Sequence, residues 1–292
     1  MLTSVALCEF LFLFFVSSAT TIFVGAVFHS KYPRKRANAV VFGILLADGL
    51  QALLTVAHCS YWILFALGYV PYSRSARLFC SYSSFLLLTA SSAFDWLSIG
   101  IIAKRIFIIC RPLDDRFEFF TTTVIFAIVL LVTSFGAVGF FVIYVVDPSE
   151  VIRDSLPAGC FTVGCGAKHP PVSQVFLVHY PIASTVLVIV TGVVFLVILR
   201  RSKVKLPKYH QIANVISKYI FIFHTVFLLI PYSVDLFLAM FNLPNIATFV
   251  GPLNKLTHTA DGIFCAFIFF VSTRKRTFHK HVVPKSNVIP RK

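Results

Sequence analysis

Residues 78–107 read LFCSYSSFLLLTASSAFDWLSIGIIAKRIF. The charged residues of this stretch are Asp95, near its middle, and Lys104 and Arg105, close to its end. A helix needs about 20 mostly apolar residues to cross the hydrocarbon core of a bilayer. The stretch therefore predicts a long membrane-spanning helix that carries one carboxylate inside the membrane.

The composition of the whole chain agrees with this interpretation. Of its 292 residues, 58% are hydrophobic and 13% are charged, and the mean hydropathy is +0.87. Soluble domains are about 45–50% apolar and about 25% charged. This composition excludes a soluble enzyme, a disordered chain and a secreted disulfide scaffold. The net charge of +15 would suggest nucleic acid as a partner, but the apolar excess favours a polytopic membrane protein without one.

Six further apolar stretches are separated by segments rich in Pro, Gly or charge. The seven predicted spans are residues 5–28, 37–61, 78–107, 121–146, 174–199, 214–240 and 247–272. The outer boundary of the second is soft and could extend to Leu67. No gap is long enough for a soluble domain. We therefore expect an all-α membrane protein, a single seven-transmembrane helix bundle over residues 1–292, ending in a basic tail at 273–292.

The basic residues fix an expected orientation. Of the 26 Lys and Arg residues, 21 fall in the alternate gaps and the tail that share one side of such a bundle. The positive-inside rule places these residues in the cytoplasm, against an anionic inner leaflet. The N-terminus is then outside, the C-terminus is cytoplasmic and the number of spans is odd. A cleaved signal peptide ending near Ala19 is the alternative, but it lacks a basic start and would move Arg34, Lys35 and Arg36 outside.

Ionisable residues inside spans are functional-site hypotheses by default. Asp48, Asp95, Asp235 and Asp261 all lie within the predicted spans. For each of them the alternative is a neutral, hydrogen-bonded aspartic acid that only joins helices.

The third span has a distinctive spacing. Cys80 and Arg105 lie 25 residues apart, which is roughly 37 Å along a helix and a full tilted crossing of the membrane. Pro112 follows Arg105 by seven residues. In this spacing the chain resembles the rhodopsin-like G-protein-coupled receptors. The Leu-Leu-Ala-Asp48 stretch is similar to their second-helix aspartate motif, and Pro231 resembles their sixth-helix proline.

The chain also departs from that family. Lys104 stands where the acidic partner of the arginine usually lies, and Ile106 replaces the tyrosine. The seventh span has Asp261-Gly262 in place of the Asn-Pro motif. With these changes the chain looks most like the nematode serpentine chemoreceptor families, whose subfamilies the motifs do not distinguish.

The resemblance implies a chemosensory receptor in the plasma membrane, by family resemblance in sensory cilia, that binds a small extracellular ligand and activates a heterotrimeric G protein. It implies no enzyme activity, no cofactor and no metal, and it leaves the oligomeric state open. The implied ligand-binding residues are Ser84, Leu88, Ser91, Tyr180, Tyr232, Asp235 and His258. The implied coupling and switch residues are Arg105, Pro112 and Pro231. Asp48 and Asp261 would form a polar centre that could hold a sodium ion.

The resemblance also implies a disulfide between Cys80 and a cysteine of the second outer loop. Cys160 is favoured over Cys165, and a local clip between Cys160 and Cys165 is the alternative. A metal site formed by these two cysteines and His169 lacks a further ligand. Lys255 has the spacing of a retinal-binding lysine, but without a counter-ion it reads better as a lysine that reaches the outer interface.

A different class of function stays open beside the receptor. A small polytopic transporter or channel would need a continuous polar path, which Asp48, Asp95 and Asp261 could line in part. Transporters show repeated halves and broken helix pairs, which this sequence lacks. His58, His179, His224 and His258 lie in or near the spans, and no catalytic motif surrounds them, so we expect interior polar contacts.

Overall fold

The computed structural model describes residues 3–29, 39–110, 115–146, 180–202, 208–241 and 253–281. Within these ranges the chain is helical and contains no strand. The elements in chain order are α1 (Thr3–His29), α2 (Ala39–Ala66), α3 (Arg74–Cys110), α4 (Asp115–Phe141), the π-helical turn η2 (Val142–Val146), α8 (Tyr180–Arg201), α9 (Lys208–His224), the π-helical turn η4 (Thr225–Leu229), α10 (Ile230–Met240) and α12 (Leu253–His281).

Five of the helices are long and apolar enough to cross a membrane, judged by length and composition. They are Ser4–His29, Phe42–Ala66, Arg74–Cys110, Phe119–Val146 and Ile182–Arg201. Two shorter apolar helices, Ala213–Leu229 and Leu256–Val271, follow. The prediction of an all-α protein with membrane-spanning helices is confirmed at this level.

The outward-facing side of α4 shows why such a chain needs lipid around it. Leu130, Leu131 and Phe135 are 69%, 72% and 63% exposed. Large apolar side chains in a continuous row would be unfavourable in water, and they suit the hydrocarbon core of a bilayer.

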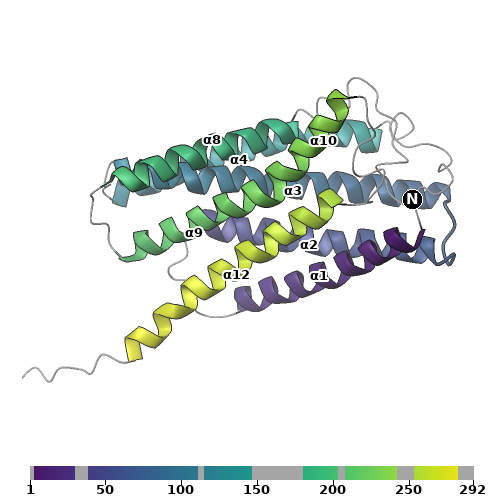
Figure 1. Ribbon diagram of the computed structural model, residues 1–292, viewed down its shortest axis with the longest axis horizontal. Helices are drawn as coiled ribbons and strands as arrows, with labels where there is room; N and C mark the ends of the chain where they lie inside the picture. Colours follow the sequence, from purple (N-terminus) through teal and green to yellow (C-terminus); the bar gives the residue numbers. More distant parts are fainter. Residues whose placement is uncertain are drawn as a thin grey trace, which may run out of the picture.

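The helices form an elongated bundle around α3 (Figure 1). α3 contacts α2, α4, α8 and α9, and it buries 20 of its 37 residues, as a central helix should. α12 packs against α1, α2 and α9. In Figure 1, α1 begins at one end of the long axis and α12 leaves the bundle at the other.

The helix boundaries differ from the predicted spans mainly by extending beyond them. α2 continues to Ala66, which agrees with the extension of the second span toward Leu67 better than with an end at residue 61. The reason lies in Gly68, which adopts a positive φ of 79°. The amides of Gly68 and Tyr69 donate to the carbonyls of Phe65 and Leu64, the pairing that closes a helix at a glycine. Residues 174–179 and 247–252 of the predicted spans lie outside the described residues.

Pro231 marks an irregularity in the sixth predicted span. Proline lacks an amide hydrogen and its ring collides with the carbonyl four residues earlier, here that of Phe227. The chain responds with the π-helical turn η4 over Thr225–Leu229, which ends two residues before Pro231. α9 and α10 are therefore two helical segments joined by a wider turn, and the predicted hinge at Pro231 stays a prediction.

Close packing fixes the rotation of α8 and α9 against each other. A methyl group at Gly192 on α8 would collide with the ring of Phe221 on α9, so glycine allows this approach. Phe221 belongs to the main core with Phe94, Phe195 and Ala266. A second, smaller core between α1, α2 and the start of α3 surrounds Trp62.

Candidate functional site

The bundle contains a buried polar cluster formed by α3, α9 and α12. His224, the last residue of α9, is 2% exposed, and Asp95, Asp261 and Cys265 are 7%, 0% and 4% exposed. His224 Nδ1 lies 2.7 Å from Asp261 Oδ2, and His224 Nε2 lies 3.5 Å from Asp95 Oδ1. One imidazole thus stands between carboxylates that come from two different helices.

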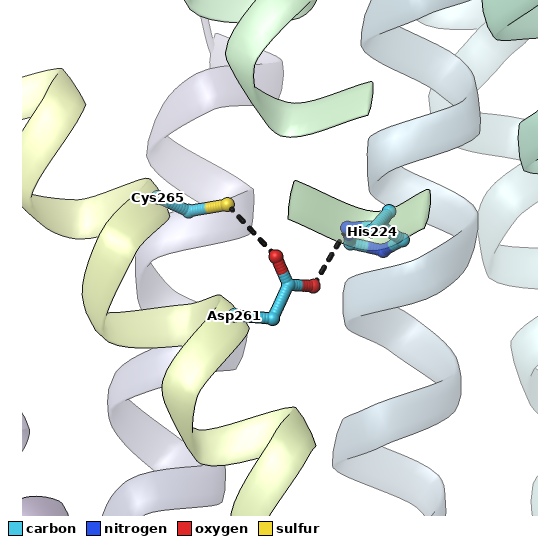
Figure 2. A group of neighbouring side chains, drawn as sticks. All are labelled: His224, Asp261 and Cys265. Carbon is cyan, nitrogen blue, oxygen red and sulfur yellow. Dashed lines mark hydrogen bonds and ion pairs between the residues drawn. The ribbon is translucent and has the colours of Figure 1, made fainter. Parts of the chain in front are cut away.

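Asp261 and Cys265 occupy the same face of α12, because residues four apart in a helix are neighbours. The thiol of Cys265 donates a hydrogen bond to Asp261 Oδ1, with 3.5 Å between the sulfur and the oxygen. Figure 2 shows both oxygens of Asp261 engaged, one facing the sulfur and the other facing the His224 ring.

The His224 ring is held from other sides as well. It stacks on Phe94 with 5.2 Å between the ring centroids. The hydroxyl of Ser184 on α8 donates to Asp95 Oδ2 at 3.3 Å, which leaves Oδ1 of that carboxylate directed at the imidazole. The cluster therefore joins α3, α8, α9 and α12 at one depth of the bundle.

Asp48 adds a third carboxylate from α2. Its carboxylate lies directly against Gly262, the residue after Asp261, so closely that a methyl group at Gly262 would collide with it. Asp48 also lies close enough to Asp261 and Cys265 for electrostatic interaction. The sequence prediction paired Asp48 with Asp261 across facing helices, and the structure places these two residues together.

His258 lies one helical turn from Asp261 on α12 and interacts electrostatically with Asp95, Asp261 and His224. The structure places His258 at the border of the polar cluster, and its predicted role in ligand binding stays a prediction.

The hydroxyl of Tyr180 ties α8 to two other helices. It donates to the carbonyl of Val132 on α4 at 3.1 Å, and it accepts a hydrogen bond from Trp96 Nε1 at 3.0 Å. Since its only proton goes to Val132, the contact with Ser92 Oγ at 2.7 Å has the serine as donor. Gly136 makes room for the ring. Tyr180 is thus a helix-joining residue in this structure.

A second buried histidine joins α2 to α3. Trp62 Nε1 donates to His58 Nε2 at 3.0 Å, so the ring proton of His58 is on Nδ1. That nitrogen lies 2.8 Å from Ser83 Oγ, and Ser83 in turn donates to the carbonyl of Cys80 at 3.1 Å. His58 therefore has one neutral tautomer, fixed by its neighbours.

Basic side chains are buried at the other end of α3. Arg105 is 2% exposed and Lys104 is 3% exposed. Lys104 Nζ donates to Thr122 Oγ1 on α4 at 2.7 Å. Lys104 thus contacts the neighbouring helix.

The remaining predicted residues are distributed as follows. Ser84 is buried, and Ser91 and Leu88 are half-buried on the same face of α3, with Leu88 packed against Ile143 and Tyr144. Pro112, Cys160, Cys165 and the side chains of Tyr232, Asp235 and Lys255 lie outside the described residues. The predicted pairing of Cys80, which is buried, with Cys160 stays a prediction.

Sequence reasoning treated His224 as one of several interior polar residues and did not single out Cys265. The available signals were a histidine in the apolar run Phe-Ile-Phe-His224 and the four-residue spacing of Asp261 and Cys265. Neither signal reveals which helix faces which, so the cluster emerges only from the packing.

Comparison with known proteins adds no family to this geometry. No protein-family model matches the chain, and no curated protein matches its sequence.

Proposed function

We propose that this chain is a seven-helix chemosensory receptor that binds a small extracellular ligand and activates a heterotrimeric G protein. The five long apolar helices and the two shorter ones support seven spans. The position of the start of α1 and the end of α12 at opposite ends of the bundle (Figure 1) is what an odd number of crossings requires. The distribution of basic residues supports an outer N-terminus and a cytoplasmic C-terminus.

One observation carries the proposal. His224 binds α9 to α3 and α12 through Asp95 and Asp261, directly before the π-helical turn η4 and Pro231. A switch needs an element with two discrete arrangements that a ligand can favour differently. A buried polar contact next to an irregular turn provides such an element, because the contact can break as a unit while α9 moves.

In the proposed mechanism, ligand binds among the outer halves of α3, α8, α10 and α12. Differential contacts shift the population toward a state in which the inner end of α9 moves away from α3. That movement exposes Arg105 and the basic inner segments to the acidic surface of a partner protein. The plasma membrane, and the cilia of sensory cells by family resemblance, are the proposed locations.

The test uses cells that express the chain with a promiscuous G-protein reporter, screened with a panel of small volatile and water-soluble compounds. For a compound that evokes a response, Arg105→Ala should abolish signalling while surface expression persists. Arg74→Ala, at an exposed position at the start of α3 on the side that we place outside, is the matched control and should signal normally. Full signalling by Arg105→Ala at equal surface expression would contradict the proposal.

The buried carboxylates and histidines also fit a second candidate, a proton-coupled transporter, because such relays occur in membrane pumps and transporters. A proton-flux assay in vesicles that contain the purified protein separates the two functions. Flux that is lost in Asp261→Asn would favour the transporter, and its absence alongside a G-protein response would favour the receptor.

A further inference from the structure

The three side chains His224, Asp261 and Cys265 form a group that could hold a metal ion. Each offers one ligand atom, and these nitrogen, oxygen and sulfur atoms all lie within 4.8 Å of one another (Figure 2). The ligand atoms of a tetrahedral zinc site lie about 3.3–3.8 Å apart, given metal–ligand distances of about 2.0–2.3 Å. Small side-chain rotations are therefore enough to bring the three atoms onto one ion.

The contact between His224 and Asp261 leaves room for a further partner of the two atoms that form it. His224 Nδ1 and Asp261 Oδ2 form an ion pair at 2.7 Å, and neither atom has a further partner within the described part of the chain. A buried ion pair repays the cost of its desolvation only when further contacts satisfy the remaining lone pairs. A cation that both atoms contact would satisfy them together.

Asp48 on α2 is a candidate for the fourth ligand. Asp48 is 4% exposed, and its Oδ2 has no hydrogen-bond partner among the described residues. It lies beside Gly262 and interacts electrostatically with both Asp261 and Cys265. A buried carboxylate oxygen without a hydrogen-bond partner, near two of the three ligands, can complete a four-coordinate site through a rotation of its side chain.

The second ring nitrogen of His224 also has the surroundings that are usual in metal sites. A histidine that binds a metal through one ring nitrogen usually donates its other N–H to a carboxylate. His224 presents Nδ1 to Asp261 and Nε2 to Asp95, at 2.7 Å and 3.5 Å. Asp95 is itself oriented by Ser184. This arrangement leaves His224 ready to coordinate an ion through Nδ1.

We propose that His224, Asp261 and Cys265, with Asp48 as the fourth ligand, bind a zinc ion that clamps α9 and α12 together. Nitrogen and thiolate ligands select Zn²⁺ over Na⁺, Mg²⁺ or Ca²⁺, which prefer oxygen alone. On binding, the thiol of Cys265 releases its proton to solvent, and His224 coordinates as a neutral ring with its proton on Nε2. The proposal concerns binding alone and does not depend on the receptor function.

The site is closed, because its side chains are almost fully buried, which is typical of zinc sites that stabilise structure. Zinc would therefore raise the stability of the arrangement seen here, in which α9 contacts α12. If the receptor function also holds, zinc would favour the state in which α9 has not moved.

The test uses the full chain purified in detergent with a peptide affinity tag free of histidine, stripped of metal with a chelator and then titrated with Zn²⁺ or Co²⁺. We expect saturating Zn²⁺ to raise Tm by about 5 °C or more. Co²⁺ should produce the intense near-ultraviolet absorption of a thiolate bound to cobalt. Both signals should disappear in Cys265→Ala and persist in Cys59→Ala, which removes a buried cysteine of the separate core around Trp62.

Two results would overturn the proposal. The first is a stripped wild-type protein that shows no change in Tm with Zn²⁺ or no thiolate–cobalt absorption. The second is absorption that survives in Cys265→Ala, because the thiolate would then come from another cysteine. Cys265→Ser keeps the volume of the side chain and serves as the second variant should Cys265→Ala fail to fold. Neither readout requires a ligand or a G protein, so a negative result leaves the proposed function to its own test.

Discussion

Gly262 on α12 lies directly against the carboxylate of Asp48 on α2, with no room at that position for a methyl group. The absence of a side chain at Gly262 is what lets the two helices bring Asp48 and Asp261 together. Glycine is normally unfavourable inside a helix by about 1 kcal/mol relative to alanine, so its presence here reflects the contact.

We therefore expect Gly262→Ala to destabilise the protein by about 1–3 kcal/mol, the usual range for overpacking a buried site. The gain in helix propensity would oppose this loss without cancelling it. Thermal unfolding in detergent measures the effect. Gly25→Ala is the matched control, since nothing lies within 4 Å of a methyl group at Gly25 on α1, and it should leave Tm unchanged or raise it. Equal behaviour of the two variants would show that the contact with Asp48 is unimportant.

Tyr180→Phe removes one hydroxyl that joins α8 to α3 and α4. The variant leaves the N–H of Trp96 and the carbonyl of Val132 without this hydrogen bond, and a lost partner at a buried group costs about 1–3 kcal/mol. We expect a lower Tm with the helical content unchanged by circular dichroism. Tyr69→Phe, at a position that is 76% exposed, should have no effect. A Tyr180→Phe protein as stable as wild type would mean that the three contacts contribute little.

Lys104→Met tests the buried lysine near the C-terminal end of α3. A buried ammonium is costly to desolvate, and its replacement by an apolar side chain of similar length is often neutral or stabilising. We expect Tm to stay constant or rise even though the hydrogen bond to Thr122 is lost. A clear fall in Tm would assign Lys104 a structural role. Signalling measured on the same variant shows whether the lysine acts with Arg105.

The orientation of the chain can be tested with cysteines placed at two described positions. Tyr69→Cys lies between α2 and α3, which we place outside, and Ser202→Cys follows α8, which we place in the cytoplasm. In intact cells, a membrane-impermeant maleimide should label Tyr69→Cys above the level of the parent protein. Ser202→Cys should gain label only after the cells are permeabilised. The reverse pattern would show that the orientation is opposite to the one we propose. Labelling of both variants in intact cells would show that an even number of crossings separates the two positions.

The helical class and the apolar spans could be predicted from the sequence because hydropathy is a local property of about 20 consecutive residues. The sequence left the end of α2 open between residue 61 and Leu67. The end depends on Gly68 in a left-handed conformation, and a single glycine is a weak sequence signal. The junction at Pro231 followed from proline chemistry alone, although the π-helical turn that absorbs it did not.

The polar cluster required the packed structure. Asp48 and Asp261 attracted attention as charges inside spans, but the partners of His224 depend on how α9 is rotated against α3 and α12. That rotation is set by contacts such as Gly192 with Phe221 and by the extra residue in η4. Tyr180 illustrates the same limit, since its residue type suits a ligand pocket equally well as a junction between helices.

The π-helical turn η4 also determines how the sixth predicted span responds to the insertion or deletion of a residue. A turn with hydrogen bonds five residues apart holds one residue more than an α-helical turn. Each residue of an α-helix contributes about 100° of rotation, so deleting a single residue from Thr225–Leu229 and restoring regular pitch would cancel, and α10 would keep its facing relative to His224. A change of one residue in chain length at this point can therefore be absorbed by η4, and the side chains of α9 and α10 keep the faces that they present to the rest of the bundle.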